Sequence, residues 1–391
     1  MNEKNQGAVS PETIVTHSGR NPFDNRGYVN TPVYRGSTIL FPTLDALESP
    51  EPRFDYGRTG NPSSATVEDL ITELEDADGT VLAPSGLSAI SLALMTVLSS
   101  GDEVLVTDSA YQPTRRVSDG VLTRMGIAVR YYDPRIAGGI AGALSDKTKA
   151  IFVESPGSLT FEVQDLLAIV AAAKPHGIAV IVDNSWATPL FHKPLTLGAD
   201  IVVHAGTKMF VGHSDAMFGT ASANAKWFRQ LKDTHLRLGL CASPDDCFLA
   251  ARGLRTLALR MNEHSIRSTA IAAWLETQPG VTKVIHPALP SHPDHAVFKR
   301  DFTGAGSVFS LLLEPKPRAA LAAMVDGFKL FAMGWSWGGY ESLALPIHPE
   351  KTRTATQWTE PGVMLRLHIG LEGVDDIKAD LASALARYRA A

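Results

Sequence analysis

The sequence lacks the features that mark secreted, membrane-spanning and nucleic-acid-binding proteins. Two cysteines, Cys241 and Cys247, are too few for a disulfide framework in a chain of 391 residues. The first twenty residues contain no apolar stretch, and the longest apolar runs fall well short of the roughly 20 residues that span a bilayer. A formal net charge of −5 leaves no basic excess for nucleic acid or an anionic membrane. We therefore expect a cytoplasmic protein with buried free thiols and with neither of those partners.

Motifs for nucleotide and metal binding are also missing. The chain has no GxxxxGK[ST] segment, and Gly138-Gly139 is not laid out as GxGxxG between a strand and a helix. His286, His292 and His295 cluster in a proline-rich loop, but no cysteine or acidic motif accompanies them. We predict that this loop is solvated and holds no metal.

The composition that remains is that of a large globular protein. Apolar residues make up 45% of the chain and charged residues 20%, and the length favours two domains. Residues 1–60 are rich in Gly, Pro, Asn and Arg without periodicity, which indicates an extended arm that lies on another surface, such as a second subunit. We expect an α/β domain at 61–255 and a smaller α+β domain at 256–391.

Short apolar segments alternate with amphipathic stretches in the first of these domains. Such continuously apolar segments are typical of parallel strands that helices cover on both faces, so the fold class is α/β. The expected strands are 103–107, 128–132, 149–154, 178–183 and 200–204. A helix should begin at Ser243 and run toward Leu275 as a bridge between the domains. Beyond it we expect strands at 307–313 and 364–369 and helices at 317–324 and from 375 onward.

Two charged residues follow strands that should be buried. Asp183 ends one strand, and Lys208 follows the next across Ala205-Gly206-Thr207. Ligands collect at the carboxyl ends of strands in open α/β sheets, and an unpaired buried charge is costly, so each residue should have a partner. Either they pair with each other or cap helices, or Lys208 is a desolvated nucleophile of lowered pKa beside a phosphorylated ligand.

A phosphate site and an anion anchor are further candidates. Ser85-Gly86-Leu87 opens a helix, whose free N–H groups and positive dipole end suit a phosphate unless the segment is an ordinary cap. Arg366 is a single cation inside an apolar strand, so it should bind a carboxylate. That carboxylate belongs either to a ligand or to a structural ion pair.

Together and in this order, these elements resemble the Cys/Met-metabolism family of pyridoxal-phosphate (PLP) dependent enzymes over nearly the whole chain. The resemblance implies an aspartate-aminotransferase type of fold, with a large, mostly parallel sheet and a smaller α+β domain. It implies PLP as cofactor and a homotetramer, a dimer of dimers that shares active sites between subunits. Seven blocks carry it: VDNSW at 182–186, TKMFVGHSDAMFGT at 207–220, RGLRTL at 252–257, HPALP at 286–290, KRDFTG at 299–304, SWGGYESL at 336–343 and RLHIGLE at 366–372.

The resemblance assigns the catalytic roles to three residues. By similarity, Lys208 carries the cofactor as a Schiff base and moves the Cα proton of the substrate. Asp183 pairs with the ring nitrogen, so that the ring acts as an electron sink. Tyr111 stacks on the ring and assists proton transfer.

The resemblance also implies binding roles. The N–H groups of Gly86 and Leu87 and the Thr207 hydroxyl would hold the phosphate of the cofactor. Tyr56 and Arg58 would reach the phosphate in a neighbouring subunit, and Tyr56 would also contact substrate there. For the substrate α-carboxylate the resemblance implies Arg366, assisted by Ser336 and the backbone of Trp337.

Four positions depart from the family pattern. Ala205 stands where a serine is usual and Ser158 where many relatives have asparagine, changes that hardly affect cofactor binding. Thr59 and Arg116 replace an arginine and an acid that some β-lyases direct toward the distal end of cystathionine. These last two changes leave the preferred substrate open.

The implied activity is cleavage of a carbon–sulfur bond in an amino-acid thioether. The expected reaction is the β-lyase reaction of methionine biosynthesis, in which cystathionine and water give homocysteine, pyruvate and ammonia. Trp335 favours it, since γ-lyases commonly carry an acid at that position. The alternatives are a γ-acting relative (cystathionine γ-lyase, methionine γ-lyase or a γ-synthase), a β-lyase of the cysteine desulfhydrase type, and an idle PLP-binding protein. Retention of Lys208, Tyr111 and Arg366 argues against the last.

Overall fold

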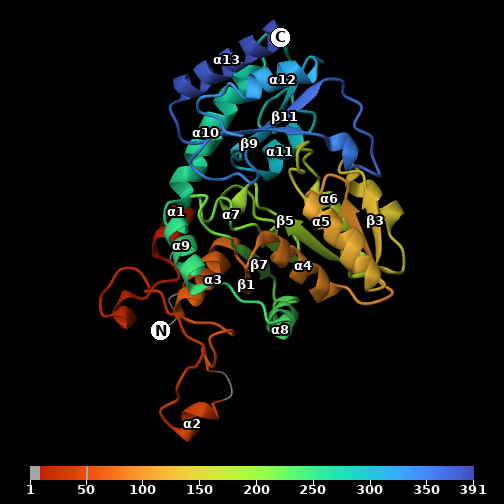
Figure 1. Ribbon diagram of the computed structural model, residues 1–391. Helices are drawn as coiled ribbons and strands as arrows, with labels where there is room; N and C mark the ends of the chain where they lie inside the picture. Colours follow the sequence, from red (N-terminus) through yellow and green to blue (C-terminus); the bar gives the residue numbers. More distant parts are fainter. Residues whose placement is uncertain (1–8, 50–51) are drawn as a thin grey trace.

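The computed structural model describes residues 9–49 and 52–391 of the chain. Figure 1 shows two parts, with the C-terminal part (blue) above the larger part and the segment around α2 (Leu44–Leu47) projecting away from both. In this described portion, no helix combines the length and the apolar character needed to cross a membrane.

The larger part is built on one sheet. Over the described residues its strands are β1 (Gly79–Ala83), β2 (Glu103–Thr107), β3 (Ala128–Tyr132), β4 (Thr148–Glu154), β5 (Ala179–Asp183), β6 (Ile201–His204) and β7 (Gly219–Ala223). They lie in the order β1-β7-β6-β5-β4-β2-β3. β7 runs antiparallel to β1 and β6, and all other neighbours are parallel. The predicted α/β fold class is confirmed.

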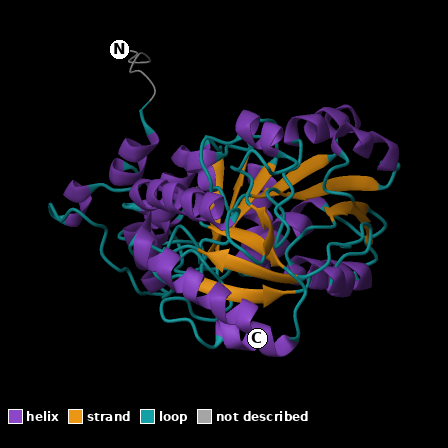
Figure 2. Cartoon of the chain, turned by 90° about the horizontal axis from the view of Figure 1, so that it is seen from above, coloured by secondary structure: helices purple, strands orange, loops and turns teal. Residues whose placement is uncertain are grey.

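Helices cover both faces of this sheet (Figure 2). The cover comes from α3 (Pro62–Glu75), α4 (Gly86–Val97), α5 (Gln112–Val117), the π-helix η2 (Ser118–Leu122), η3 (Ala137–Ala143), α6 (Leu166–Ala173), η4 (Lys174–His176), α7 (Thr188–Phe191), α8 (Phe228–Leu238) and α9 (Pro244–Leu254). Because of this cover every residue of β1, β2, β5, β6 and β7 is buried. The prediction of burial on both faces is wrong for β3, an edge strand with exposed residues.

The smaller part is an antiparallel sheet with helices against it. Its strands, in the order β10-β11-β9-β8, are β8 (Val281–Ile285), β9 (Val308–Leu313), β10 (Leu343–Ile347) and β11 (Val363–His368). Phe309, Leu365 and Tyr388 are fully buried in its core. The helical elements are α10 (Leu257–Leu275), α11 (His295–Asp301), α12 (Arg318–Val325), η5 (Pro349–Lys351) and α13 (Val374–Ala390).

Most predicted elements of the smaller part are confirmed within about a residue, whereas the single bridging helix is wrong. Ser243 caps α9 as expected, but that helix ends at Leu254 and α10 starts at Leu257. Arg260 of α10 donates to the Gly253 carbonyl at 2.7 Å, which satisfies a backbone acceptor that a continuous helix would have used. The domain boundaries proposed at residues 60 and 255 stay predictions.

The arm is only partly extended. It contains α1 (Pro11–His17) and η1 (Pro22–Asn25), and α1 buries Ile14 and Val15 against the rest of the same chain. Other apolar side chains of the arm are left in solvent, with Phe23 89% and Leu40 88% exposed. Residues 1–8 and 50–51, which belong to the predicted arm, lie outside the described residues.

Asp108 joins the two parts directly after β2. Its buried carboxylate accepts from Arg115 Nη1 at 2.9 Å and from the backbone of Thr354 and Thr356 at 2.9 and 2.7 Å. The Thr356 hydroxyl donates to it as well, at 2.7 Å. Burial alone would raise the pKa of Asp108, but the hydrogen bonds from residues 354–356 outweigh it and hold the pKa below its usual value.

Asp108→Asn should destabilise the protein by about 3 kcal/mol, because it leaves Arg115 as a buried cation without its counter-charge. Chemical unfolding followed by circular dichroism measures this change. Since the pKa of Asp108 is depressed in the folded state, its contribution is present above about pH 4 and is lost as the pH falls further. The matched control is Asp233→Asn, which removes an exposed i,i+4 pair with Arg237 and should cost about 0.5 kcal/mol or less. Equal losses of stability for the two variants would contradict the conclusion that the Asp108 carboxylate joins the two parts.

Candidate functional site

The carboxyl ends of three neighbouring strands bring the candidate groups to one edge of the large sheet. Glu154 ends β4, Asp183 ends β5, and the turn after β6 leads to Lys208. Glu154 and Asp183 are direct partners in the register of β4 and β5. This edge is where ligands bind in open α/β sheets, so the structure places the candidates as expected.

Asp183 has hydroxyl and amide partners instead of a counter-ion. Its Oδ1 accepts from the backbone N–H of Ser185 at 2.9 Å and from the Ser185 hydroxyl at 2.6 Å. In the described part of the chain, Oδ2 accepts no hydrogen bond and no cation lies within 4 Å of the carboxylate. The alternative of an Asp183–Lys208 ion pair is therefore wrong, and one carboxylate oxygen is left for a ligand.

Lys208 reaches the smaller part of the chain. Its Nζ donates to Ser336 Oγ at 2.5 Å and lies 5.3 Å from the centroid of the Trp337 ring. Burial, helped by the charge of Arg366, lowers the pKa of Lys208 to about 8, while Asp183 opposes the shift. The lowered pKa increases the unprotonated fraction of this amine at neutral pH, and the unprotonated form is the one that acts as a nucleophile.

Arg366 in β11 is a buried guanidinium without a carboxylate. Its Nη2 donates to the carbonyls of Ser336 at 2.8 Å and Gly334 at 3.3 Å, whereas its buried Nε has no partner among the described groups. The structural ion pair considered for Arg366 is thus wrong. Buried donors of this kind are normally satisfied, so the unpaired Nε indicates a site for an anion.

Ser336 links the two cations, with its hydroxyl on Lys208 and its carbonyl on Arg366. Its φ of +75° lies in the left-handed region, an uncommon conformation for a residue with a side chain. Close by, a Cβ on Gly338 would lie 2.9 Å from the Lys208 backbone, so the loop approaches the lysine as closely as glycine allows.

The predicted phosphate site lies at the start of α4, and its binding of phosphate stays a prediction. Ser85 caps the helix, and the N–H groups of Gly86 and Leu87 donate to no residue in the described ranges. A Cβ on Gly86 would lie 2.5 Å from the Ala205 Cβ, so glycine is needed for the close approach. The Thr207 hydroxyl is already engaged with the backbone of Phe218, donating at 3.1 Å and accepting at 2.8 Å.

Tyr111 stands at the edge with 46% of its surface exposed, and Glu154 binds its backbone N–H. The Tyr111 N–H donates to Glu154 Oε2 at 2.7 Å. Burial, and then the charge of Asp183, raises the pKa of Glu154 well above its usual value. Glu154 was missed, although it ends a predicted strand beside Asp183 and was open to the same reasoning.

Tyr56 and Arg58 are not brought to this edge by their own chain. Arg58 Nη1 donates to the Leu236 carbonyl at 3.1 Å, and its guanidinium lies 5.9 Å from the centroid of the Tyr56 ring. Within residues 9–49 and 52–391, neither side chain forms a hydrogen bond or an ion pair with Lys208 or Asp183. Their predicted role in a neighbouring subunit stays a prediction.

The histidine loop and the cysteines differ from expectation. The interpretation of a solvated loop is wrong, because His286 and His292 are buried and accept hydrogen bonds from nearby backbone at 3.1 Å. Across 9–49 and 52–391 there is no group of three or more His, Cys, Asp or Glu side chains arranged to hold a metal. Both thiols are free, but only Cys247 is buried as predicted, since Cys241 is exposed.

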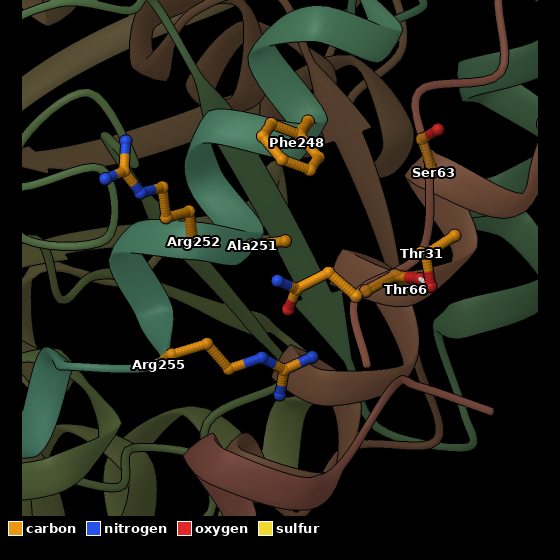
Figure 3. A pocket seen from close by; sticks show the side chains of 8 residues that line it. Thr31, Ser63, Thr66, Phe248, Ala251, Arg252 and Arg255 are labelled. Carbon is orange, nitrogen blue, oxygen red and sulfur yellow. Dashed lines mark hydrogen bonds between the residues drawn. The ribbon is translucent and has the colours of Figure 1, made fainter. Parts of the chain in front are cut away.

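A separate cavity of about 300 Å³ lies between the arm, α3 and α9. Figure 3 shows Phe248 facing Thr31 and Thr66 across it, while the side chain of Arg252 points away. Arg255 also lines the cavity, and its Nη1 already donates to the carbonyls of Val15 and Ser18. None of the predicted site residues lines this cavity.

The residues at the sheet edge fit PLP. The group needs an amine for its aldehyde, a carboxylate for its ring nitrogen, an aromatic face and N–H donors for its phosphate. Lys208, the free Oδ2 of Asp183, Tyr111 and the unpaired N–H groups of Gly86 and Leu87 supply these in turn. The unpaired Nε of Arg366 adds a place for a substrate carboxylate.

Comparison with known proteins also indicates PLP as the cofactor. Residues 12–386 match the model of the "Cys/Met metabolism PLP-dependent enzyme" family. A "Putative cystathionine beta-lyase" of Rhizobium johnstonii is 44% identical over 96% of this chain and 95% of its own, and an "L-alanine/L-glutamate racemase" of Wolbachia pipientis is 38% identical over 97% and 98%. The crystal structure of cystathionine gamma synthase from Xanthomonas oryzae pv. oryzae with aminoacrylate and cysteine has a TM-score of 0.91 and 34% identity, over 98% and 99% of the two chains.

The rate at which the PLP-free protein takes up PLP should rise with pH, with half of the rise near pH 8. Below that pH Lys208 is protonated and unreactive, and above it the neutral amine dominates. Stopped-flow absorbance of the visible band of lysine-bound PLP measures the rate. Lys208→Ala is the control and should give no band. A midpoint near the ordinary lysine value of about 10.4 would show that burial does not tune this amine.

Proposed function

Because the chain belongs to the Cys/Met-metabolism family of PLP-dependent enzymes, we propose that it is a carbon–sulfur β-lyase that acts on cystathionine. The products are homocysteine, pyruvate and ammonia, with one water consumed. The observation that carries the proposal is the arrangement around Ser336, whose hydroxyl accepts from Lys208 and whose carbonyl accepts from Arg366. Ser336 thereby fixes the distance between the Arg366 guanidinium, which binds the substrate carboxylate in the proposed reaction, and the Lys208 amine, which moves the proton.

The proposed reaction assigns a role to each residue of the candidate site. Arg366 binds the α-carboxylate of the substrate through its unpaired Nε, and Ser336 and the Trp337 backbone close that end of the site. Lys208 takes the proton from Cα and returns a proton to the thiolate that leaves Cβ. PLP, when bound, accepts the electron pair left on Cα, and ionised Asp183 at its ring nitrogen supports this.

The substrate end of the site favours β-cleavage. Trp335, next to Ser336, is 83% exposed and provides an apolar surface without a carboxylate. Burial, and then the charge of Glu154, raises the Tyr111 pKa above its usual value, and the charge of the exposed Arg116 opposes this shift. A single lysine base at Cα is sufficient for removal of a β-substituent.

Product analysis tests the proposal. Purified holoenzyme incubated with cystathionine, cysteine or methionine should release pyruvate from cystathionine, identified by chromatography of the keto-acid hydrazones, and none should form with Lys208→Ala. Formation of 2-oxobutyrate in place of pyruvate would assign the chain to the γ-acting enzymes. Conversion of alanine or glutamate to the D-enantiomer without any keto acid would assign it to racemisation.

We further propose that the arm completes the phosphate site of a neighbouring subunit in a homotetramer. Two observations support this: Arg58 and Tyr56 lie away from their own Lys208, and the arm exposes apolar side chains such as Phe23 and Leu40 that a partner would cover. Methionine biosynthesis is the process that such a β-lyase serves.

Subunit mixing tests the shared site. Arg58→Ala and Lys208→Ala chains should each have little activity, and co-refolding equal amounts should restore about one quarter of the native value, because half of the dimers are hybrids with one intact site of two. Absence of any gain, with both variants folded and oligomeric, would show that each subunit completes its own site.

A further inference from the structure

Two segments of the chain meet beside the candidate site. The first, which we call the lysine turn, comprises residues 205–218 between β6 and β7, and the second, the serine loop, comprises residues 334–342 before β10. Gly338 of the loop lies against the backbone of the lysine itself, where a Cβ would not fit. A Cβ on Gly339 would collide with the hydroxyl of Ser214, so the close approach of the two segments continues past the lysine.

In the described ranges, two side-chain hydrogen bonds join these segments. Lys208 Nζ donates to Ser336 Oγ, and Ser214 Oγ donates to Glu341 Oε1, both at 2.5 Å. Ser214 is the one hydrogen-bond donor to the Glu341 side chain there, because Oε2 is buried without a partner. Burial of a carboxylate oxygen is costly, and the hydrogen bond from Ser214 offsets part of that cost.

Both serines adopt a backbone conformation that is uncommon for a residue with a side chain. Ser214 has a φ of +58° and Ser336 a φ of +75°, and both values lie in the left-handed region. Such conformations persist where surrounding contacts hold them, and they concentrate at functional sites. Ser214 is exposed, so its contact with Glu341, and not packing in a core, holds it in this conformation.

The proposed chemistry affects the two hydrogen bonds differently. Lys208 cannot keep its bond to Ser336 throughout, because its nitrogen carries PLP and moves a proton in its proposed role. The bond between Ser214 and Glu341 involves no reacting atom and remains in place. Since the Ser336 carbonyl also accepts from Arg366, the position of the serine loop sets the distance between the amine and the guanidinium that binds the substrate carboxylate.

The serine loop is also fixed to its own part of the chain. The buried His368 side chain of β11 contacts the Gly338 N–H at 3.3 Å and the Gly339 carbonyl at 3.1 Å. These contacts hold the loop against β11 but do not reach the lysine turn. Once the lysine nitrogen is engaged elsewhere, the bond between Ser214 and Glu341 is the side-chain hydrogen bond that still joins the two segments in the described structure.

We propose that Glu341 is a positioning residue, whose hydrogen bond from Ser214 keeps the serine loop docked on the lysine turn while Lys208 is engaged with PLP and substrate. The inference rests on the proposed role of Lys208, and it holds whichever amino acid the enzyme acts on. Its consequence is that loss of the bond lets water reach the amine and shifts the amine relative to Arg366.

The charge state of Lys208 reports whether the serine loop is docked. Burial, and then the charge of Arg366, lowers the pKa of Lys208 to about 8, whereas the charge of Asp183 opposes the shift. His368 also faces the amine, but burial lowers the pKa of this imidazole to about 3, so it stays neutral while Lys208 titrates. Because burial is the largest of these influences and the loop provides part of it, a released loop should raise the Lys208 pKa.

Uptake of PLP by the PLP-free protein tests the docking. In Ser214→Ala, the pH at which the uptake rate is half-maximal should rise by about one unit, because the amine is better solvated. Glu341→Gln keeps an acceptor oxygen for the Ser214 hydroxyl and should retain the native midpoint. Stopped-flow absorbance measures both rates. A native midpoint in Ser214→Ala would overturn the proposal.

Proton exchange in the holoenzyme tests the alignment. Exchange of the Cα proton of L-alanine with deuterium oxide, followed by NMR, needs the amine of Lys208 but no leaving group. Ser214→Ala and Glu341→Ala should each lower the maximum exchange rate about fivefold, and the alanine concentration for half-maximal rate should change by less than about twofold, since Arg366 is retained. The double variant should be no slower than either single variant. Losses that multiply in the double variant would overturn the proposal.

Ser291→Ala is the matched control, because it removes another hydrogen bond from an exposed serine to a glutamate, Glu276, away from the site. It should leave the uptake midpoint and the exchange rate unchanged. If Lys208→Ala still gives the visible PLP band and exchanges the Cα proton, the proposed role of Lys208 fails. If Lys208→Ala does neither and Ser214→Ala behaves as the native protein, only the assignment to Glu341 fails.

Discussion

The structure depends on one constraint: several charged groups are buried close together and do not form ion pairs with one another. Asp183 and Lys208 leave neighbouring strands of one sheet and affect each other's charge, yet each is held by a serine hydroxyl. Arg366 is likewise held by carbonyls and not by an acid. A protein without a ligand would gain stability from pairing these groups or replacing them, so the arrangement is maintained for what binds there.

These charged groups stay separated only while the larger and the smaller part of the chain remain docked against each other. Asp108, after a strand of the large sheet, binds the backbone of residues 354–356 that precede β11. The loop that carries Ser336 meets the Lys208 turn so closely that Gly338 tolerates no side chain. The lysine therefore has its lowered pKa only when both parts are docked, since its burial depends on that loop.

The same scaffold accommodates more than one reaction, as the relatives named for lyase, synthase and racemase chemistry show. The groups that act on the Cα proton and the carboxylate suit all of these reactions. Trp335 and Arg116, which the proposed function places near the substrate side chain, are both exposed. Under the proposed function, the choice of substrate depends more on these exposed positions than on the buried edge.

Local pattern was enough to locate the parallel strands, Asp183, Lys208 and the capped start of α4, because apolar runs and capping residues reflect interactions between near neighbours. It failed for β7, whose Gly, Thr, Ser and Ala give no apolar run, and Glu154 was overlooked although it ends a predicted strand. The partners of the charged groups came only from the tertiary structure. Ser336 is 128 residues from Lys208, Glu341 is 127 from Ser214 and Thr356 is 248 from Asp108, and contacts over such separations leave no periodic trace in the sequence.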